Sequence, residues 1–246
     1  MIVKSFNLHN HRYTTEELLV NHLRAIVFDL DGTLIHSKID FMKMKQRMIN
    51  ILEENGIPEG VLTPKETTVV TLEKTENLWN RAGKPEKERI EVRSQLNEVM
   101  NEEELDVIPR ITEVEGAAAA LRDLKEMGYK LAILTRSHYA YAVEALEKIE
   151  AHEYFEVILG RDETPRPKPY PEALGHTVKL LGLKMDEIVF VGDNHIDFQS
   201  AENSGCAFIG VRTGSRHRDP WAGQEPEVQI ESVAKLPEYM QGLNSN

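Results

Sequence analysis

Two acidic residues, Asp29 and Asp31, stand directly after the short apolar segment 25–28 and form the pattern on which a functional interpretation depends. The apolar segment is rich in β-formers and predicts a strand buried on both faces. Because residues two apart in a strand point the same way, the two carboxylates can converge on one point. Gly32 and Thr33 then allow the backbone to turn away. Two carboxylates this close repel each other unless a metal ion or a basic group neutralises them.

An alternative interpretation of residues 29–32 is an ordinary turn, rich in Asp and Gly, that closes a strand. Later segments favour chemistry instead, because polar residues also follow the ends of other predicted strands. These residues are Thr135, Lys168, Asp193 and Asp197. Ligands of a parallel sheet bind outside the carboxyl ends of its strands. An acid pair, a hydroxyl, an amine and a second acid pair at one edge favour an active site over a simple turn.

The fold class follows from the alternation of short apolar runs with helical patterns. The predicted strands are 25–28, 129–134, 155–159, 187–191, 207–211 and a weaker one near 228–230. Predicted helices occupy 14–19, 116–127, 140–149 and 171–181, and others follow 197 and begin at Ser232. Strand and helix joined by short connections predict an α/β fold. We therefore expect a Rossmann-like, doubly wound parallel sheet with right-handed crossovers and helices on both faces.

An all-helical block interrupts this alternation at about 36–106. Its apolar residues recur at helical spacing from Phe41 to Leu52, and Asn55-Gly56 ends that helix,. A second helix is expected to start at Thr63–Glu66, with an N-cap, a proline and a glutamate in the favoured order. A third follows Pro85, with Ile90, Leu96 and Met100 as its apolar residues. The Met and Trp79 side chains are expected to fill its core. The predicted core domain is then 1–35 with 107–246, and 36–106 is an inserted helical domain.

Composition narrows the possible partners and compartment. The chain has 246 residues, 41% of them hydrophobic and 28% charged, as in a globular protein,. Its net charge of −12 argues against nucleic-acid binding,. No apolar run approaches a membrane-spanning length, and Met1–Arg12 lacks the apolar stretch of a signal peptide. One cysteine, Cys206, excludes an internal disulfide,. We expect a cytoplasmic protein without membrane or nucleic-acid partners.

The polar motifs, in this order, resemble those of the haloacid dehalogenase-like (HAD) hydrolase superfamily, specifically its phosphatases of the phosphoglycolate phosphatase type. Residues 29–33 resemble the first motif, Thr135 the second, Lys168 the third and 192–197 the fourth. The resemblance extends from about 24 to about 214, and the helical block resembles a C1-type cap. Two departures concern the substrate. Residues 35–37 lack the Asp that usually follows the first motif, and Arg136 stands where Asn or Ser often follows the second.

The resemblance implies a phosphatase for a small phosphorylated metabolite, similar to phosphoglycolate or a sugar phosphate. It implies that Asp29 attacks phosphorus to form an aspartyl-phosphate, while Asp31 protonates the leaving oxygen and then activates water. Thr135 and Lys168 would hold the phosphoryl oxygens.

The implied cofactor is Mg²⁺, a hard cation that takes oxygen ligands. Its expected ligands are Asp29, Asp193 and the backbone carbonyl of Asp31, with Asp197 as a direct or indirect ligand.

Several alternatives stay open at this point. Arg136 either binds phosphate or a substrate carboxylate, or lies on the surface. The basic loop 212–218 could approach the site from the same edge, but a solvated loop or a subunit contact is favoured. A phosphosugar mutase similar to β-phosphoglucomutase would use the same aspartyl-phosphate, and a non-catalytic binding module is a further alternative. The oligomeric state is expected to be a monomer or a homodimer.

Overall fold

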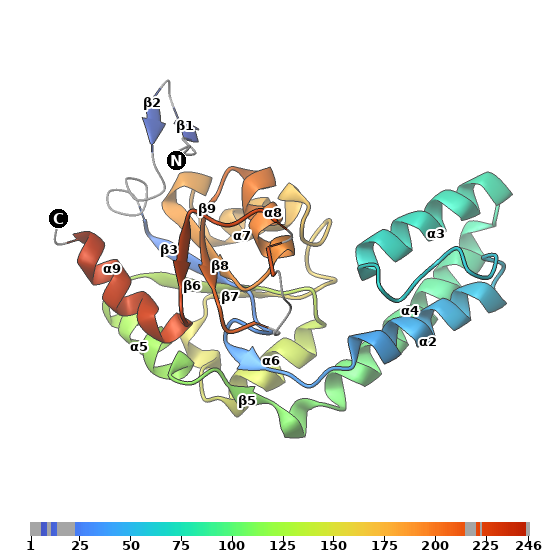
Figure 1. The fold of residues 1–246 in the computed structure, drawn as a ribbon, viewed down its shortest axis with the longest axis horizontal. Coiled ribbons are helices and arrows are strands. Elements are labelled where there is room, and N and C mark those ends of the chain that lie inside the picture. Colours follow the sequence, from blue (N-terminus) through green and yellow to red (C-terminus); the bar gives the residue numbers. More distant parts are fainter. Residues whose placement is uncertain (1–5, 9–10, 14–22, 215–219, 222, 245–246) are drawn as a thin grey trace. The chain divides into compact units, whose positions relative to one another are not determined.

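The computed structural model of the chain describes residues 6–8, 11–13, 23–214, 220–221 and 223–244 (Figure 1). The chain forms two compact units. The first takes in the chain up to Ser37 and again from Arg110 onward, and the second runs from Lys38 to Pro109. The helix expected at 14–19 lies outside the described residues, as do residues 215–218 of the expected basic loop.

A six-stranded sheet in which all neighbours are parallel forms the centre of the first unit. In spatial order its strands are β10 (Val228–Ile230), β9 (Ala207–Val211), β8 (Ile188–Gly192), β3 (Ala25–Phe28), β6 (Lys130–Leu134) and β7 (Val157–Leu159). Every residue of β3, β8 and β9 is buried, which explains why these strands are apolar along their whole length,. After β3 the chain adds β6 and β7 on one side, then β8, β9 and β10 on the other. This order confirms the predicted doubly wound fold.

Helices cover both faces of this sheet. They are α5 (Ala117–Glu126), α6 (Tyr139–Lys148), α7 (Pro171–Leu181), α8 (His195–Ser204) and α9 (Leu236–Asn244). On one face, Leu174 and Val178 of α7 and Ala201 of α8 pack with Val27 and Phe190 of the sheet. Figure 1 shows α5 and α9 on the other side. The predicted bounds of α7, β9 and β10 are confirmed, and those of the other strands of the sheet and of α5 and α6 differ by at most two residues at either end.

The other strands among the described residues form two small antiparallel sheets. β1 (Phe6–Leu8) pairs with β2 (His11–Tyr13). β4 (Ile35–His36) pairs with β5 (Thr112–Glu113), where the chain leaves the first unit and returns to it. No helix among the described residues is both long and apolar enough to cross a membrane.

The second unit contains three α-helices, α2 (Phe41–Glu54), α3 (Thr68–Ala82) and α4 (Glu86–Leu105). Its apolar core includes Met44, Met48, Leu52, Trp79, Leu96 and Met100, so these Met and Trp side chains fill the core as predicted. Two residues expected among the buried ones are exposed, Phe41 by 45% and Ile90 by 57%. Phe41 is the first residue of α2 and precedes its buried stretch. Ile90 lies two residues before the buried Val92 and therefore points to the opposite side of α4,.

The start of α3 differs from the prediction. The helix begins at Thr68, and Thr67 caps it by accepting a hydrogen bond from the Val70 N–H at 3.3 Å. Residues 63–66 form a turn instead, in which the Glu66 N–H donates to the Thr63 carbonyl at 3.1 Å. Both segments offer a threonine hydroxyl for capping, and local sequence alone does not distinguish them.

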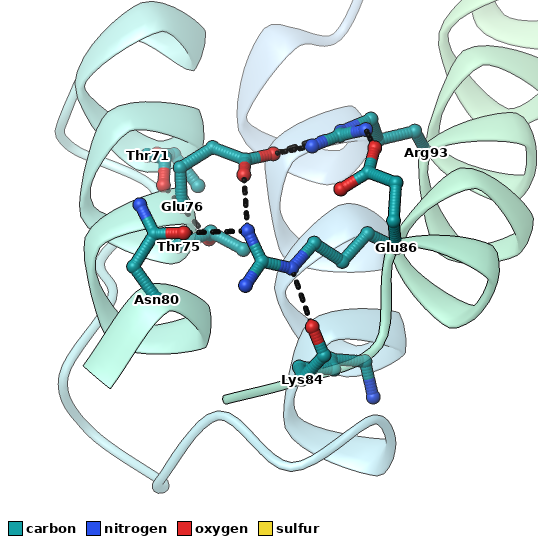
Figure 2. A network of polar contacts seen from close by, with 8 residues as sticks. Thr71, Thr75, Glu76, Asn80, Lys84, Glu86 and Arg93 are labelled. Atoms are coloured by element: carbon teal, nitrogen blue, oxygen red, sulfur yellow. Dashed lines mark hydrogen bonds and ion pairs between the residues drawn. The ribbon is translucent and has the colours of Figure 1, made fainter. Parts of the chain in front are cut away.

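Charged side chains join α3 to α4 across the second unit (Figure 2). Glu76 of α3 pairs with Arg93 of α4 at 2.6 Å, and Arg89 of α4 donates to Asn80 of α3 at 2.6 Å. Trp79 is buried beside this layer, with the Arg93 guanidinium 6.0 Å from its ring centroid. Exposed ion pairs contribute at most about 1 kcal/mol each, so the buried indole is the larger stabilising contribution.

Candidate active site

The first acid of the opening motif lies at the carboxyl end of β3. Asp29 is buried, with 6% of its surface exposed. The chain turns immediately afterwards, where the Gly32 N–H donates to the Ile35 carbonyl at 2.7 Å. Gly32 has φ +87°, and a Cβ atom there would lie 2.6 Å from Oδ2 of Asp193. The turn therefore requires glycine both for its backbone angle and for its close approach to a second acid.

The register of the sheet brings three motif residues to one edge. β3 lies between β6 and β8, and its last residue is opposite Ile133 of β6 and Val191 of β8. Asp29, Thr135 and Asp193 each follow one of these strands directly. They therefore meet at the carboxyl edge of the sheet, where ligands of doubly wound folds bind.

Three buried carboxylates form a cluster at this edge. Asp29, Asp193 and Asp197 each offer an oxygen atom, and these atoms lie within 4.8 Å of one another. Asp197 is in the first turn of α8, which Asn194 caps by accepting a hydrogen bond from the Ile196 N–H at 2.9 Å. The Asn194 side chain also donates to Oδ1 of Asp193 at 3.1 Å. One capping residue thus fixes the start of the helix and orients a member of the cluster.

Lys168 supplies a cation to this cluster. Its Nζ donates to Oδ1 of Asp29 at 2.5 Å and to Oδ1 of Asp197 at 2.7 Å, and the residue is only 2% exposed. Burial lowers the pKa of Lys168, but the carboxylates of Asp197 and Asp29 raise it by more, so the net shift is upward,. The ammonium group therefore stays charged at neutral pH. Lys168 is thus a buried residue of the cluster and not a solvated surface lysine.

One lysine does not neutralise three buried carboxylates. Burial first, and then the nearby charge of Asp197, raise the pKa of Asp29 to about 6, while Lys168 acts in the opposite direction,. Burial and the charges of Asp197 and Asp29 likewise raise the pKa of Asp193 well above its usual value. Oδ2 of Asp197 is buried and accepts no hydrogen bond from any described residue. The cluster therefore fits a divalent cation that prefers oxygen ligands.

The carboxyl group of Asp31 lies outside the cluster and has its own donors. The Tyr141 hydroxyl donates to Oδ1 at 2.7 Å, and the Ser137 hydroxyl lies 3.4 Å from Oδ2. Burial raises the pKa of Asp31 to about 6, although hydrogen bonds from Ser37 and Tyr141 lower it,. The Asp31 carboxyl group is thus not one of those that could together hold a metal ion, and it can exchange a proton near neutral pH.

The second motif also lies at this edge. Thr135 is buried, and its hydroxyl oxygen accepts a hydrogen bond from the Ser137 N–H at 3.1 Å. Arg136 is half-buried, and burial lowers its pKa while the charges of Asp197 and Asp29 raise it. Arg136 is thus near the acidic cluster and not on the open surface.

The sequence did not single out two residues that shape the site. Tyr141 is indistinguishable by pattern from the other apolar residues on the buried side of α6. Gly214 follows β9, and a Cβ atom there would overlap the carboxyl group of Asp193. The position of Gly214 just past the end of a predicted strand was the sequence feature that could have identified it. Of the basic loop, Arg212 is exposed and pairs with Glu231 at 3.3 Å, whereas 215–218 lie outside the described residues.

Gly214→Ala is expected to weaken divalent-cation binding by about 10- to 100-fold, as changes beside metal ligands commonly do. Its backbone has no positive φ, so the effect comes from the methyl group displacing Asp193. Calorimetric titration with Mg²⁺ measures it. Gly175→Ala in α7 is the control, because nothing lies within 4 Å of the added atom. That control should bind normally and be stabilised by about 0.5–1 kcal/mol. Normal binding by the Gly214 variant would contradict the expectation.

Asp193→Asn is expected to stabilise the metal-free protein at neutral pH, because it removes one of the repelling buried charges. The folded pKa of Asp193 is raised above its unfolded value. The folded state therefore binds more protons, and this site costs stability as pH rises above about 4. The gain in melting temperature over wild type should thus be larger at pH 7.5 than at pH 4.5. Millimolar Mg²⁺ should raise the melting temperature of wild type but not of the variant. An equal response of both proteins to Mg²⁺ would contradict this.

Comparisons with known proteins agree with this geometry. The model of the haloacid dehalogenase-like hydrolase family matches residues 26–211. The phosphoglycolate phosphatase of Neisseria meningitidis serogroup A is 32% identical over 231 residues, which cover 91% of this chain and 95% of that protein. The phosphoglycolate phosphatase of Pseudomonas syringae pv. tomato is 28% identical over 235 residues, covering 90% of this chain and 81% of that protein.

A solved structure supports the fold. The HAD-superfamily hydrolase, subfamily IA, variant 1 of Geobacter sulfurreducens superposes with a TM-score of 0.56 at 18% identity, covering 88% of this chain and 99% of that one. The matches confirm the predicted superfamily and the predicted class of enzyme, a phosphatase. Since the family match spans most of the chain and contains all four motifs, the chain belongs to the haloacid dehalogenase-like hydrolase family.

Proposed function

We propose that the chain is a Mg²⁺-dependent phosphatase that hydrolyses a small phosphorylated metabolite through an aspartyl-phosphate on Asp29. The observation that carries this proposal is the buried carboxylate of Asp29 at the carboxyl edge of the sheet, hydrogen-bonded to Lys168 and next to two further acids. The names of the relatives, phosphoglycolate phosphatases, support a substrate of the phosphoglycolate class.

In the first step, Asp29 acts as the nucleophile. A pKa of about 6 leaves its carboxylate mostly ionised at neutral pH,. Lys168 reduces the repulsion between this carboxylate and an incoming phosphate, and its ammonium charge stabilises the charge on the phosphoryl oxygens in the transition state. The Thr135 hydroxyl, at the end of the neighbouring strand, donates to a phosphoryl oxygen.

Asp31 transfers the protons. It gives a proton to the leaving oxygen in the first step and takes one from water in the second, when the aspartyl-phosphate is hydrolysed. Its pKa of about 6 suits both roles, because each protonation state is accessible near neutral pH.

Asp29, Asp193 and the backbone carbonyl of Asp31 would hold Mg²⁺, and Asp197 would act directly or through a water molecule. When bound, the ion neutralises charge on the phosphoryl group and offsets the repulsion among the carboxylates. Arg136 would bind an anionic group of the substrate, because it is half-buried near the acidic cluster.

The helical unit, Lys38–Pro109, is proposed to be the cap that excludes water and selects the substrate. In the sequence this unit lies between β4 and β5, soon after the first motif, and this place supports the proposed role. The protein is proposed to act in the cytoplasm as a monomer or a homodimer.

The test is an assay of inorganic phosphate released from p-nitrophenyl phosphate, phosphoglycolate and a panel of sugar phosphates. Release that requires Mg²⁺ and stops with EDTA is expected. Activity that is indifferent to EDTA would contradict the proposal. Isomerised sugar phosphate without free phosphate would identify a mutase instead.

A further inference from the structure

The hydrogen bond from Tyr141 to Asp31 is the best-defined contact of the proposed acid. Tyr141 is completely buried on α6, and its hydroxyl donates to Oδ1 of Asp31 at 2.7 Å. An O–H group that donates to a carboxylate at this distance makes a strong, charge-assisted hydrogen bond. The donor comes from a helix, whereas Asp31 lies in the turn after β3. The bond therefore ties a residue of the turn to a helix.

Rigidity of the donor follows from how α6 is held. His138 caps the helix by accepting from the Ala140 N–H at 3.2 Å. The neighbouring loop lies against its first turn, because a Cβ atom on Gly160 would be 2.6 Å from the Tyr139 backbone nitrogen. With no exposed surface, the Tyr141 ring has no room to swing away from Asp31.

The orientation of the Asp31 carboxyl group is consequently restricted. Rotation about the last side-chain bond of an aspartate is soft, so a carboxyl group without a fixed donor presents either oxygen. Here Oδ1 accepts from Tyr141 at 2.7 Å, and the hydroxyl groups of Ser37 and Ser137 also hydrogen-bond to the carboxyl group. The completely buried Tyr141 therefore limits the rotation of this carboxyl group.

We propose that Tyr141 is a positioning residue that holds the carboxyl group of Asp31 in the orientation in which it exchanges a proton with the leaving oxygen and with water. This inference rests on the proposed phosphatase function. In the first step a bond forms between Asp29 and phosphorus, the bond from phosphorus to the leaving oxygen breaks, and the proton on the Asp31 carboxyl group moves to that oxygen. In the second step water attacks phosphorus, its proton returns to the Asp31 carboxylate, and the bond between phosphorus and Asp29 breaks.

The test compares two substrates of similar shape that differ in how much their leaving oxygen needs a proton. Phenyl phosphate has a poor leaving group, whereas p-nitrophenolate leaves readily without protonation. In Tyr141→Phe, kcat/KM for phenyl phosphate should fall about ten-fold or more, which is part of the roughly 10²–10⁴-fold that general acid catalysis contributes. For p-nitrophenyl phosphate, kcat/KM should change by less than about three-fold, because this constant ends at the first phosphoryl transfer.

A second readout comes from the hydrolysis step, in which Asp31 acts on water for every substrate. With p-nitrophenyl phosphate, kcat and KM should fall together in Tyr141→Phe while kcat/KM is kept. A general loss of packing would not separate kcat from kcat/KM in this way. Because both substrates are measured on the same preparation, their ratio stays meaningful even if part of the variant is unfolded.

Tyr139→Phe is the matched control, since it makes the same change two residues away on a side chain that is 43% exposed. It should leave both constants unchanged. An equal loss for both substrates in Tyr141→Phe, or no loss, would overturn the inference while leaving the phosphatase function intact. Wild-type protein that releases phosphate from neither substrate would contradict the proposed function and this inference together.

Discussion

Asp29→Asn is expected to lower kcat for phosphate release by about 10⁴-fold or more, the order of loss seen when an enzyme loses its nucleophile. An amide is a far weaker nucleophile than a carboxylate and forms no acyl-phosphate here. The loss should occur without unfolding. Because burial and the charge of Asp197 disfavour the ionised form of Asp29, its neutral replacement should stabilise the metal-free protein at pH 7.5,.

The measurement combines phosphate release with trapping of the phosphorylated enzyme by acid quench and mass spectrometry. Wild type should show a phosphorylated species that the Asn variant lacks. Asp123→Asn is the control, because that carboxyl group is 46% exposed on α5 and should matter to neither readout. An Asp29→Asn protein that keeps activity within ten-fold of wild type would refute the covalent mechanism.

Lys168→Met is expected to be the second severe change, with activity reduced by about 10²–10³-fold and stability by about 3–5 kcal/mol. The Met side chain fills similar space, so the loss comes from the missing charge. Without the ammonium group, Asp29 and Asp197 lose the cation that bonds to both of them. The pKa of Asp29, now about 6, should rise further.

The pH dependence distinguishes this charge effect from a packing effect. With Lys168 removed, the buried carboxylates have a higher pKa in the folded state than in the unfolded chain, so the folded state binds more protons. The destabilisation therefore grows as pH rises above about 4 and is smaller in more acidic solution. Denaturant unfolding at pH 4.5 and 7.5 measures the difference. Lys179→Met, on the exposed side of α7, is the control. A loss of stability independent of pH would show that Lys168 acts by packing alone.

The fold was largely predictable because strands and connections leave a strong pattern in the sequence. The runs 25–28, 188–192 and 207–211 are buried on both faces, and such runs are uniformly apolar,. The polar residues at their ends were predictable as neighbours for the same reason. That the carboxylates of Asp29, Asp193 and Asp197 lie within 4.8 Å of one another depends on the register of the strands. The alternation of strands and helices implies this register but gives no distances.

What the sequence did not reveal depends on tertiary contact. The helix α3 starts at Thr68 and not near Thr63, since two threonines compete as caps and packing decides between them,. Tyr141 has the apolar surroundings of a core aromatic residue, and only the fold brings its hydroxyl to Asp31. Gly214 acts through the space that a methyl group would take from Asp193.

The main-chain ladder of the sheet has a consequence for how the site is lost. The Asp29 N–H donates to the Val191 carbonyl and the Thr135 N–H to the Leu159 carbonyl, so the peptide groups of two motif residues are rungs of that ladder. Their protons should exchange with deuterium only when the whole sheet opens. The spacing between the backbones of Asp29 and Thr135 is therefore as durable as the sheet itself, and gradual heating should leave it intact until cooperative melting.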